Sequence, residues 1–241
     1  MKNDIINNLF ELWKHIGVNG QFLHNEEQYN YVKPGNDSWP SKVFELTESK
    51  MNFKELYRNI ENGSIPNAIS ILENQVLETQ LLAHNFELMS IVKGMHLNLR
   101  EEDKPINNFA SIEKVDSEIK AMEFAKMASL SFGYEVLSST IIPLINSSKL
   151  KLFIGKHNNN YASCGMVLLD KKGNSGLHMI GTIPECRGLG LGKIMTNKLL
   201  FESFENKSKQ TVLVASESGE RIYAKLGFKA QGSLKSYSIK K

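Results

Sequence analysis

The segment ECRGLGLGKIMTNKLL, residues 185–200, places three glycines at alternate positions directly before a helical pattern. Glycine lets backbone N–H groups approach a ligand without obstruction by a side chain. The start of a helix adds unpaired N–H groups and the positive end of the helix dipole. This combination predicts a loop that binds a phosphate group, although a glycine-rich turn that only reverses the chain is the structural alternative.

Two common phosphate-binding motifs do not fit the segment. The P-loop needs Ser or Thr after its Gly-Lys pair, whereas Ile194 follows here, and Arg187 stands where the first glycine belongs. The dinucleotide fingerprint needs three-residue spacing between its last two glycines, whereas the glycines here are two apart. Neither a Walker-type nor a dinucleotide-binding loop is therefore predicted.

Hydrophobic patterning divides the chain into two halves. The charged, proline-containing segment REEDKPINN, residues 100–108, predicts a boundary between domains at 1–105 and 106–241. In the first half we expect a helix at 3–16, a hairpin within 29–46, a helix at 52–62 and one or two strands at 86–99. The second half predicts the order β-α-α-β-β-β-α-β-α-β, with the glycine loop before its third helix.

Two motifs in the second half resemble those of the GCN5-related N-acetyltransferases. TIPECRGLGLGKIM resembles the acetyl-coenzyme A loop of that family, R/Q-x-x-G-x-G/A after a strand, and Arg187, Gly190 and Gly192 fill the pattern. ASESGERIYAKLGFKAQG resembles the next motif, in which a tyrosine, here Tyr223, precedes an LGF turn. The resemblance covers about residues 106–241. It implies an α/β (α+β) fold with a mixed, mostly antiparallel sheet flanked by helices, and residues 1–105 are then a candidate degenerate second copy.

The same resemblance implies an acetyl-coenzyme A-dependent N-acetyltransferase that acts on a primary amine. The cofactor diphosphate is expected on the backbone of the loop, and the pantetheine arm beside the strand before it. Ser216 stands where many relatives have asparagine and is expected to hydrogen-bond the cofactor or to cap a helix. The predicted cofactor-binding residues are Ile180, Gly181, Thr182, Arg187, Gly188, Leu189, Gly190, Leu191, Gly192, Lys193 and Ser216.

Two residues are candidates for proton transfer. Tyr223 is the candidate acid for the departing thiolate, because a phenol is protonated at neutral pH; packing of helix against sheet is the structural alternative. His178, on the strand before the loop, is the candidate base, since the pKa of an ordinary imidazole is about 6.5; a hydrogen-bonded or exposed strand histidine without a catalytic role is the alternative. We expect residues 1–105 to shape the acceptor site, with Trp39 either enclosing the amine or anchoring a loop.

Composition excludes several function classes. The net charge is +3, from 29 basic and 26 acidic residues, which does not indicate nucleic acid. The six histidines show no metal-ligand spacing, so no metal is expected, and the two cysteines are too few for a disulfide framework. No apolar run has membrane-span length, so a cytoplasmic protein without membrane contact is predicted. The resemblance implies a small-molecule or peptide amine as the acceptor. A non-catalytic acyl-coenzyme A-binding regulatory module and an ATP- or NAD-binding protein are the alternatives.

Overall fold

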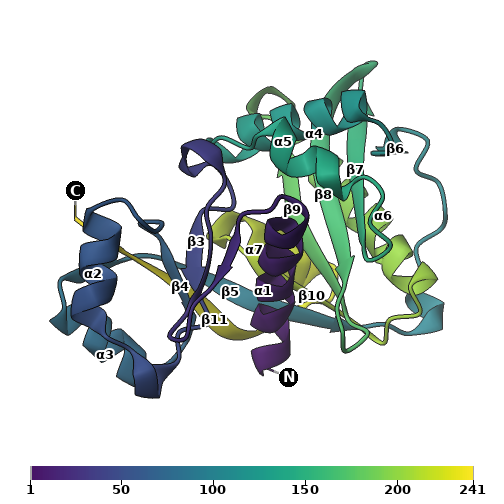
Figure 1. The fold of residues 1–241 in the computed structure, drawn as a ribbon. Helices are drawn as coiled ribbons and strands as arrows, with labels where there is room; N and C mark the ends of the chain where they lie inside the picture. The colour runs from purple at the N-terminus through teal and green to yellow at the C-terminus, as the bar shows by residue number, and fades with distance from the viewer. Residues whose placement is uncertain (1, 241) are drawn as a thin grey trace.

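A computed structural model describes residues 2–240, and its strands form one continuous sheet (Figure 1). Across the sheet the strand order is β1-β2-β3-β4-β11-β5-β10-β9-β8-β7-β6. The strands are β1 (Leu23–Asn25), β2 (Asn30–Val32), β3 (Lys42–Phe44), β4 (Ile69–Leu72), β5 (Phe86–Asn98), β6 (Ile112–Lys114), β7 (Leu150–His157), β8 (Asn160–Leu169), β9 (Ser175–Thr182), β10 (Gln210–Ala215) and β11 (Lys229–Ile239). Only the β3–β4 and β9–β10 pairs are parallel among the pairs described. This confirms the predicted mixed, mostly antiparallel sheet.

Helices cover both faces of the sheet. They are α1 (Lys2–Asn19), α2 (Phe53–Glu61), α3 (Gln75–Ala83), α4 (Glu118–Phe132), α5 (Ser138–Ile141), α6 (Leu191–Glu205) and α7 (Glu217–Lys225). Local signals set their ends: the Ser117 hydroxyl accepts a hydrogen bond from the Lys120 N–H at the start of α4, and Gly133, with φ 75°, ends that helix. The predicted helix at 135–146 is shorter than expected, because α5 gives way to a 3-10 turn at Ile142–Leu144 that contains Pro143.

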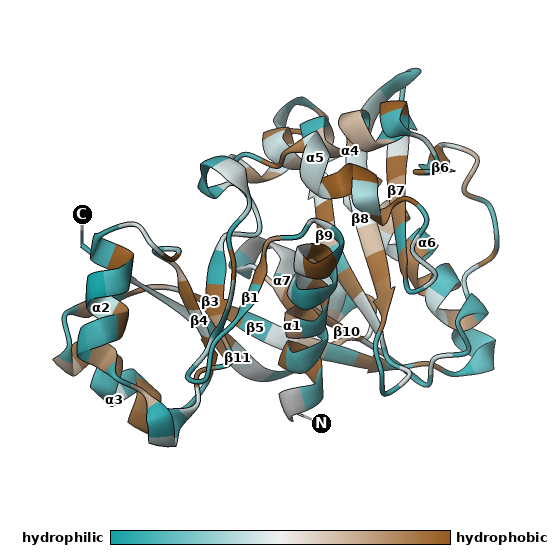
Figure 2. Cartoon of the chain, viewed as in Figure 1, coloured by the Kyte–Doolittle hydropathy of each residue, from teal (hydrophilic) through white to brown (hydrophobic). Residues whose placement is uncertain are grey.

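The two halves of the chain share one core. Helix α1, from the first half, packs in the same buried cluster as α4 and the inner faces of β7 and β8. Figure 2 shows hydrophobic residues along β7, β8 and one side of α1. On the other face, α6 packs on β8 and β9, and α2 and α3 pack on β4, β5 and β11. The predicted boundary at 105 lies in the connection between β5 and β6, but it does not separate two independent cores.

Strand pairing is repeated in the two halves. In β1-β2-β3-β4 and in β7-β8-β9-β10, two antiparallel pairs precede one parallel pair, and a helix connects the parallel strands. The last strand of each half then pairs with the other half: β5 lies against β10, and β11 lies against β4. The halves are thus joined by an exchange of their final strands. This repetition has the form that a degenerate second copy of the fold would give.

Candidate active site

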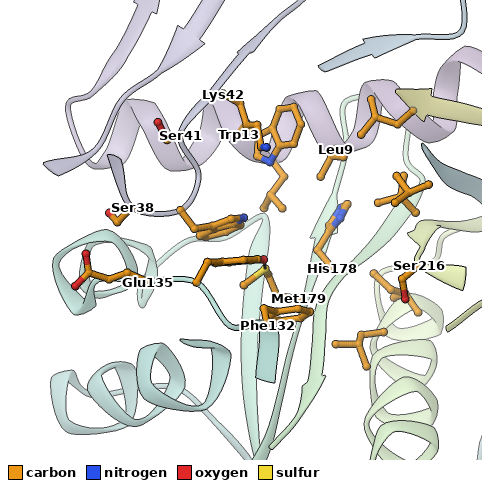
Figure 3. Close-up of a pocket in the computed structure, with 18 of the residues that line it drawn as sticks. Leu9, Trp13, Ser38, Ser41, Lys42, Phe132, Glu135, His178, Met179 and Ser216 are labelled. Atoms are coloured by element: carbon orange, nitrogen blue, oxygen red, sulfur yellow. Dashed lines mark hydrogen bonds between the residues drawn. The ribbon is translucent and has the colours of Figure 1, made fainter. Parts of the chain in front are cut away.

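A pocket of about 680 Å³ opens where β9 and β10 diverge (Figure 3). The two parallel strands pair only at Thr211–Ser175 and Val212–Gly176, so the rest of β9 has no partner on that side among the strands described. Both halves of the chain line the pocket. Its walls are Leu9, Leu12 and Trp13 of α1, the segment Asn36–Trp39 with Ser41 and Lys42, Val92, Phe132, Tyr134 and Glu135, Leu177–Ile180 of β9, Val214, Ser216, Tyr223 and Leu234.

A bulge in β9 turns one backbone donor toward the open side. Between the pairs Cys164–Gly181 and Met166–His178 the register shifts, and Met179 has φ 50°. The Cys164 thiol, on β8, donates to the Met179 carbonyl oxygen at 3.4 Å, so this carbonyl points toward β8. A trans peptide places the next N–H opposite its carbonyl. The Ile180 N–H therefore points to the side where β10 has diverged.

The glycine loop follows β9 directly. After a 3-10 turn at Pro184–Cys186, Gly188 and Gly190 have φ 82° and 80°, the left-handed region that favours glycine. A Cβ added at either position would meet no heavy atom within 4 Å, so the outer side of the loop is open. Helix α6 begins at Leu191 without a side-chain cap at Gly190. The loop thus offers backbone N–H groups and a helix start to an anion, and these fit the diphosphate of coenzyme A.

Arg187 fixes the loop to the rest of the fold. Its guanidinium donates to the Ser131 carbonyl at 2.9 Å, at the end of α4, and to the Thr182 carbonyl at 3.4 Å. The side chain therefore holds the loop against α4 and β9. The predicted role of Arg187 was diphosphate binding by its backbone. The anchoring role of its side chain was not predicted, because no sequence pattern marks the helix-end carbonyl that it binds.

The other predicted cofactor residues lie along β9, on the loop and at the start of α7. Ile180 lines the pocket, and Thr182 lies beside the loop, because a Cβ on Gly192 would be 3.7 Å from the Thr182 hydroxyl. Gly181 has a packing reason: an added Cβ would lie 2.6 Å from the Ser131 Cβ of α4. The Ser216 hydroxyl caps α7 by accepting from the Gly219 N–H at 3.3 Å. Leu189, Leu191 and Lys193 belong to the loop and the first turn of α6; Leu189 and Lys193 are exposed.

Tyr223 lines the pocket from α7. Its ring packs edge-on against Phe228, with centroids 5.9 Å apart, so the packing alternative describes part of its role. Burial of the phenol raises the pKa of Tyr223 to about 12. The side chain is therefore protonated at neutral pH and faces the same cavity as Ile180.

His178 is buried between β9 and α1. Its Nε2 lies 2.7 Å from Asn8 Oδ1, and Asn8 Nδ2 donates to the Asp170 carboxylate at 3.0 Å. Burial lowers the pKa of His178 to about 3, so the imidazole is neutral at physiological pH. Because the sequence interpretation assumed an ordinary imidazole pKa, this burial weakens the predicted role of His178 as a general base.

The structure also bears on the buried cysteine, on metal binding and on membrane contact. Cys164 is fully buried, and burial raises the pKa of its thiol to about 12, as expected for a cysteine that packs as a small hydrophobic residue. Within residues 2–240, no group of three or more His, Cys, Asp or Glu side chains has the arrangement of a metal site. No described helix is long and apolar enough to cross a membrane.

The first half of the chain contributes several pocket residues, and only one of them was predicted individually. Trp39 was expected at the acceptor site or as a loop anchor; it lines the pocket, and its backbone N–H donates to the Glu135 carbonyl at 2.9 Å. Trp13 and Lys42 were not anticipated. Trp13 follows the ordinary apolar spacing of α1, and Lys42 lies in a three-residue strand, so neither pattern distinguishes a pocket wall from a core or surface position.

Comparisons with known proteins agree with this architecture. Residues 129–237 match the acetyltransferase (GNAT) domain family. No curated protein sequence matches the chain. Among solved structures, a GCN5-related N-acetyltransferase from Kribbella flavida has a TM-score of 0.66 at 15% identity, over 91% of this chain and 89% of that chain. A GCN5-related N-acetyltransferase from Sphaerobacter thermophilus has a TM-score of 0.59 at 9% identity, over 93% and 84%.

A third similar structure is a GCN5-related N-acetyltransferase-like protein from Streptococcus suis, with a TM-score of 0.57 at 10% identity, over 98% of this chain and 100% of that chain. At these identities the three structures show a shared fold, and the likeness extends over both halves of the chain. The domain match at residues 129–237 includes both sequence motifs of the second half. The chain therefore has the fold of the GCN5-related N-acetyltransferases, and its residues 129–237 match the GNAT acetyltransferase domain.

Proposed function

We propose that the protein transfers the acetyl group of acetyl-coenzyme A to a primary amine. The observation that carries the proposal is the pocket at the divergence of β9 and β10, which has Tyr223 and the bulged backbone of β9 in its walls. The glycine loop follows the end of the same strand. The match to the GNAT domain supports acyl transfer in general. That the donor is acetyl-coenzyme A and the acceptor is a primary amine is the more specific part of our proposal.

Acetyl-coenzyme A would supply the activated thioester. The backbone N–H groups of residues 188–193 would hold its diphosphate, because Gly188 and Gly190 leave their outer side open. The unpaired edge of β9 at Ile180–Thr182 would align the pantetheine arm by strand-like hydrogen bonds. Arg187 would keep the loop in register with this edge through its bond to the Ser131 carbonyl.

The Ile180 N–H is our candidate for stabilising negative charge on the carbonyl oxygen. It is held in place by the bulge at Met179, whose carbonyl is engaged on the opposite side by Cys164. A donor fixed in advance requires no reorganisation when the charge develops, and loss of one such donor typically costs about 10²–10³ in rate.

Tyr223 would donate its phenolic hydrogen to the departing sulfur. A thiol has an ordinary pKa of about 8.5, while the pKa of Tyr223 is raised to about 12. Because the phenol is the weaker acid, we expect hydrogen-bond donation to contribute more than complete proton transfer. The same burial that raises the pKa strengthens that hydrogen bond.

The acceptor amine must lose a proton, and His178 is a weak base for this step because its pKa is about 3. We infer that the proton leaves through water in the open pocket, and that His178 contributes a fixed polar atom to the pocket wall. Its hydrogen bond to Asn8 holds the ring in one orientation.

The test combines binding with turnover. Calorimetry with acetyl-coenzyme A, ATP and NAD should show binding of acetyl-coenzyme A alone, and release of free thiol should accelerate with some members of a broad amine panel. Binding of acetyl-coenzyme A without thiol release from any amine would favour the non-catalytic regulatory module instead. Binding of ATP or NAD in its place would overturn the assignment.

A further inference from the structure

The pocket contains a lysine side chain from the first half of the chain. Lys42 lies on β3, two residues before Phe44, so strand geometry places both side chains on one face of the sheet. Phe44 packs against Trp13 of α1, with ring centroids 5.4 Å apart. Lys42 is among the residues that line the pocket, and Figure 3 shows it next to Trp13.

The Lys42 ammonium has no counter-charge. Within residues 2–240, its Nζ has no carboxylate within ion-pair distance and no hydrogen-bond partner, and burial lowers its pKa. The nearby Glu45 carboxylate is already engaged by Lys14 and by the Asn30 amide. The Lys42 side chain is half-buried, so its ammonium is only partly solvated, and a carboxylate in the pocket would supply the missing counter-charge.

The two carboxylates of the pocket lie at its rim. Asp37 and Glu135 are exposed, the Asp37 carboxylate accepts from the Ser41 hydroxyl at 3.5 Å, and Figure 3 shows Glu135 extending away from the cavity centre. Between this rim and β9 the walls are mainly apolar and aromatic. They include Trp13, Trp39, Phe132, Tyr134, Met179 and Val214. A molecule in this cavity therefore meets an apolar surface, one inner cation and the acyl-transfer edge of β9.

We propose that the acceptor is an amine with an apolar or aromatic body and a carboxylate, and that this carboxylate pairs with the Lys42 ammonium while the amine faces β9. An amino acid with a large apolar side chain has this chemistry. The inference rests on the proposed acetyl transfer, because it assigns the substrate class of the same pocket. Hydrogen bonds between ionised groups are about twice as strong as neutral ones, so the carboxylate would give selectivity as well as affinity.

The experiment compares matched probes in the full chain. N-acetylphenylalanine and N-acetylleucine represent products with a carboxylate, and their primary amides represent the same molecules without the charge. Binding is measured by calorimetry with coenzyme A present, and thiol release is measured with phenylalanine, leucine and the corresponding decarboxylated amines. The variants are Lys42→Met, Lys42→Arg and the control Lys54→Met, the same substitution at an exposed position of α2.

The wild type and Lys54→Met should bind the carboxylates at least about tenfold more tightly than the amides, as expected for one charge-assisted interaction. Lys42→Met should abolish this preference, and Lys42→Arg should keep part of it. Circular dichroism and binding of acetyl-coenzyme A should be the same in all variants. Equal binding of carboxylates and amides by the wild type, or a preference that survives in Lys42→Met, would overturn the proposal.

The two readouts separate this inference from the proposed function. A carboxylate preference in binding that depends on Lys42, without thiol release from any amine, would support the anion site and contradict acetyl transfer. Thiol release with simple amines, together with no carboxylate preference in either assay, would support acetyl transfer and contradict the anion site.

Discussion

Asn8 determines which ring nitrogen of His178 carries the proton. The Asp170 carboxylate only accepts hydrogen bonds, so the Asn8 amide must donate to it and present its oxygen to His178. His178 Nε2 is then the protonated nitrogen and Nδ1 has the free lone pair. Asp170 is itself fixed by the N–H groups of Lys172 and Asn174, at 2.9 Å and 2.8 Å. A residue of the first half thus sets the chemistry of a residue of the second.

The neutral state of His178 predicts acid sensitivity of the fold. The pKa is about 3 in the folded protein and about 6.5 in the unfolded chain, so between these values only the unfolded chain binds the proton. Stability from this site is complete above pH 6.5 and decreases as the pH falls toward 3. Urea denaturation should show the free-energy difference between the wild type and His178→Gln falling by about 1.4 kcal/mol per pH unit below 6.5. A difference that stays constant with pH would contradict the buried neutral imidazole.

Tyr223→Phe isolates the phenolic hydrogen, because phenylalanine keeps the ring that packs on Phe228. We expect kcat to fall by roughly 10²-fold, the low end for acid–base catalysis, with the melting temperature nearly unchanged. The matched control is Tyr57→Phe, on α2, whose ring packs against Phe86 outside the pocket. Thiol release at saturating acetyl-coenzyme A is the measurement. Wild-type turnover by Tyr223→Phe would leave this residue with packing alone.

Among the elements, the glycine loop has glycine both for its left-handed backbone and for the proposed binding of the cofactor. A matched pair of variants separates these two effects. Gly190 and Gly173 both have a left-handed φ, 80° and 81°, with open space around an added Cβ. Gly190→Val and Gly173→Val should therefore strain the backbone to a similar degree, at about 1 kcal/mol of stability each. Only Gly190→Val should weaken binding of acetyl-coenzyme A, by at least tenfold or about 1.4 kcal/mol. Calorimetry that gives equal affinities for the two variants would show that the loop does not hold the cofactor.

Elements with strong local signals were predictable from the sequence. The alternating glycines mark the loop before the helix at 191–205. Ser117 marks the start of α4 and Gly133 marks its end, each to within a few residues. Strand β4 and helix α3 were not anticipated. Strand β4 is a short apolar run without a clear period, whereas the start of α3 has a local signal that was overlooked, the Asn74 side chain that accepts from the Val76 and Leu77 N–H groups. The partners of β5 and β11 were also unpredictable, since strand exchange depends on pairing between residues more than a hundred positions apart.

The site shows the same division between local and distant information. Tyr223, Ile180 and the glycine loop follow from motifs within one half of the chain. Tyr223 and Ile180 line the pocket, and the loop lies next to Thr182 at the end of β9. Lys42 and Asn8 come from the other half, and no local pattern marks them. The lowered pKa of His178 could not be predicted from the sequence either, because it depends on burial of the side chain under α1.

At the scale of the whole molecule, the two halves are repeated in topology but differ in the loop that binds phosphate. In the second half the glycine loop connects β9 to α6, and in the first half residues 45–52 connect β3 to α2. That connection, ELTESKMN, contains no glycine. We therefore expect one acetyl-coenzyme A per chain by calorimetry. A stoichiometry of two would contradict the assignment of the cofactor to the second half.

Strand exchange also predicts that the two halves unfold together. Residues 106–241 alone would lose β5, the strand between β10 and β11, and the buried face of α1, so an isolated half is not a suitable test of function. The full chain offers a reporter in each half: both tryptophans, Trp13 and Trp39, lie in the first, and the buried Cys164 lies in the second. In a Cys186→Ser variant, tryptophan emission and the reactivity of Cys164 toward a thiol reagent should change at the same urea concentration, as for one cooperative unit. Exposure of Cys164 in a separate transition, while the tryptophan signal stays native, would show that the second half unfolds independently and that the exchanged strands do not couple the halves.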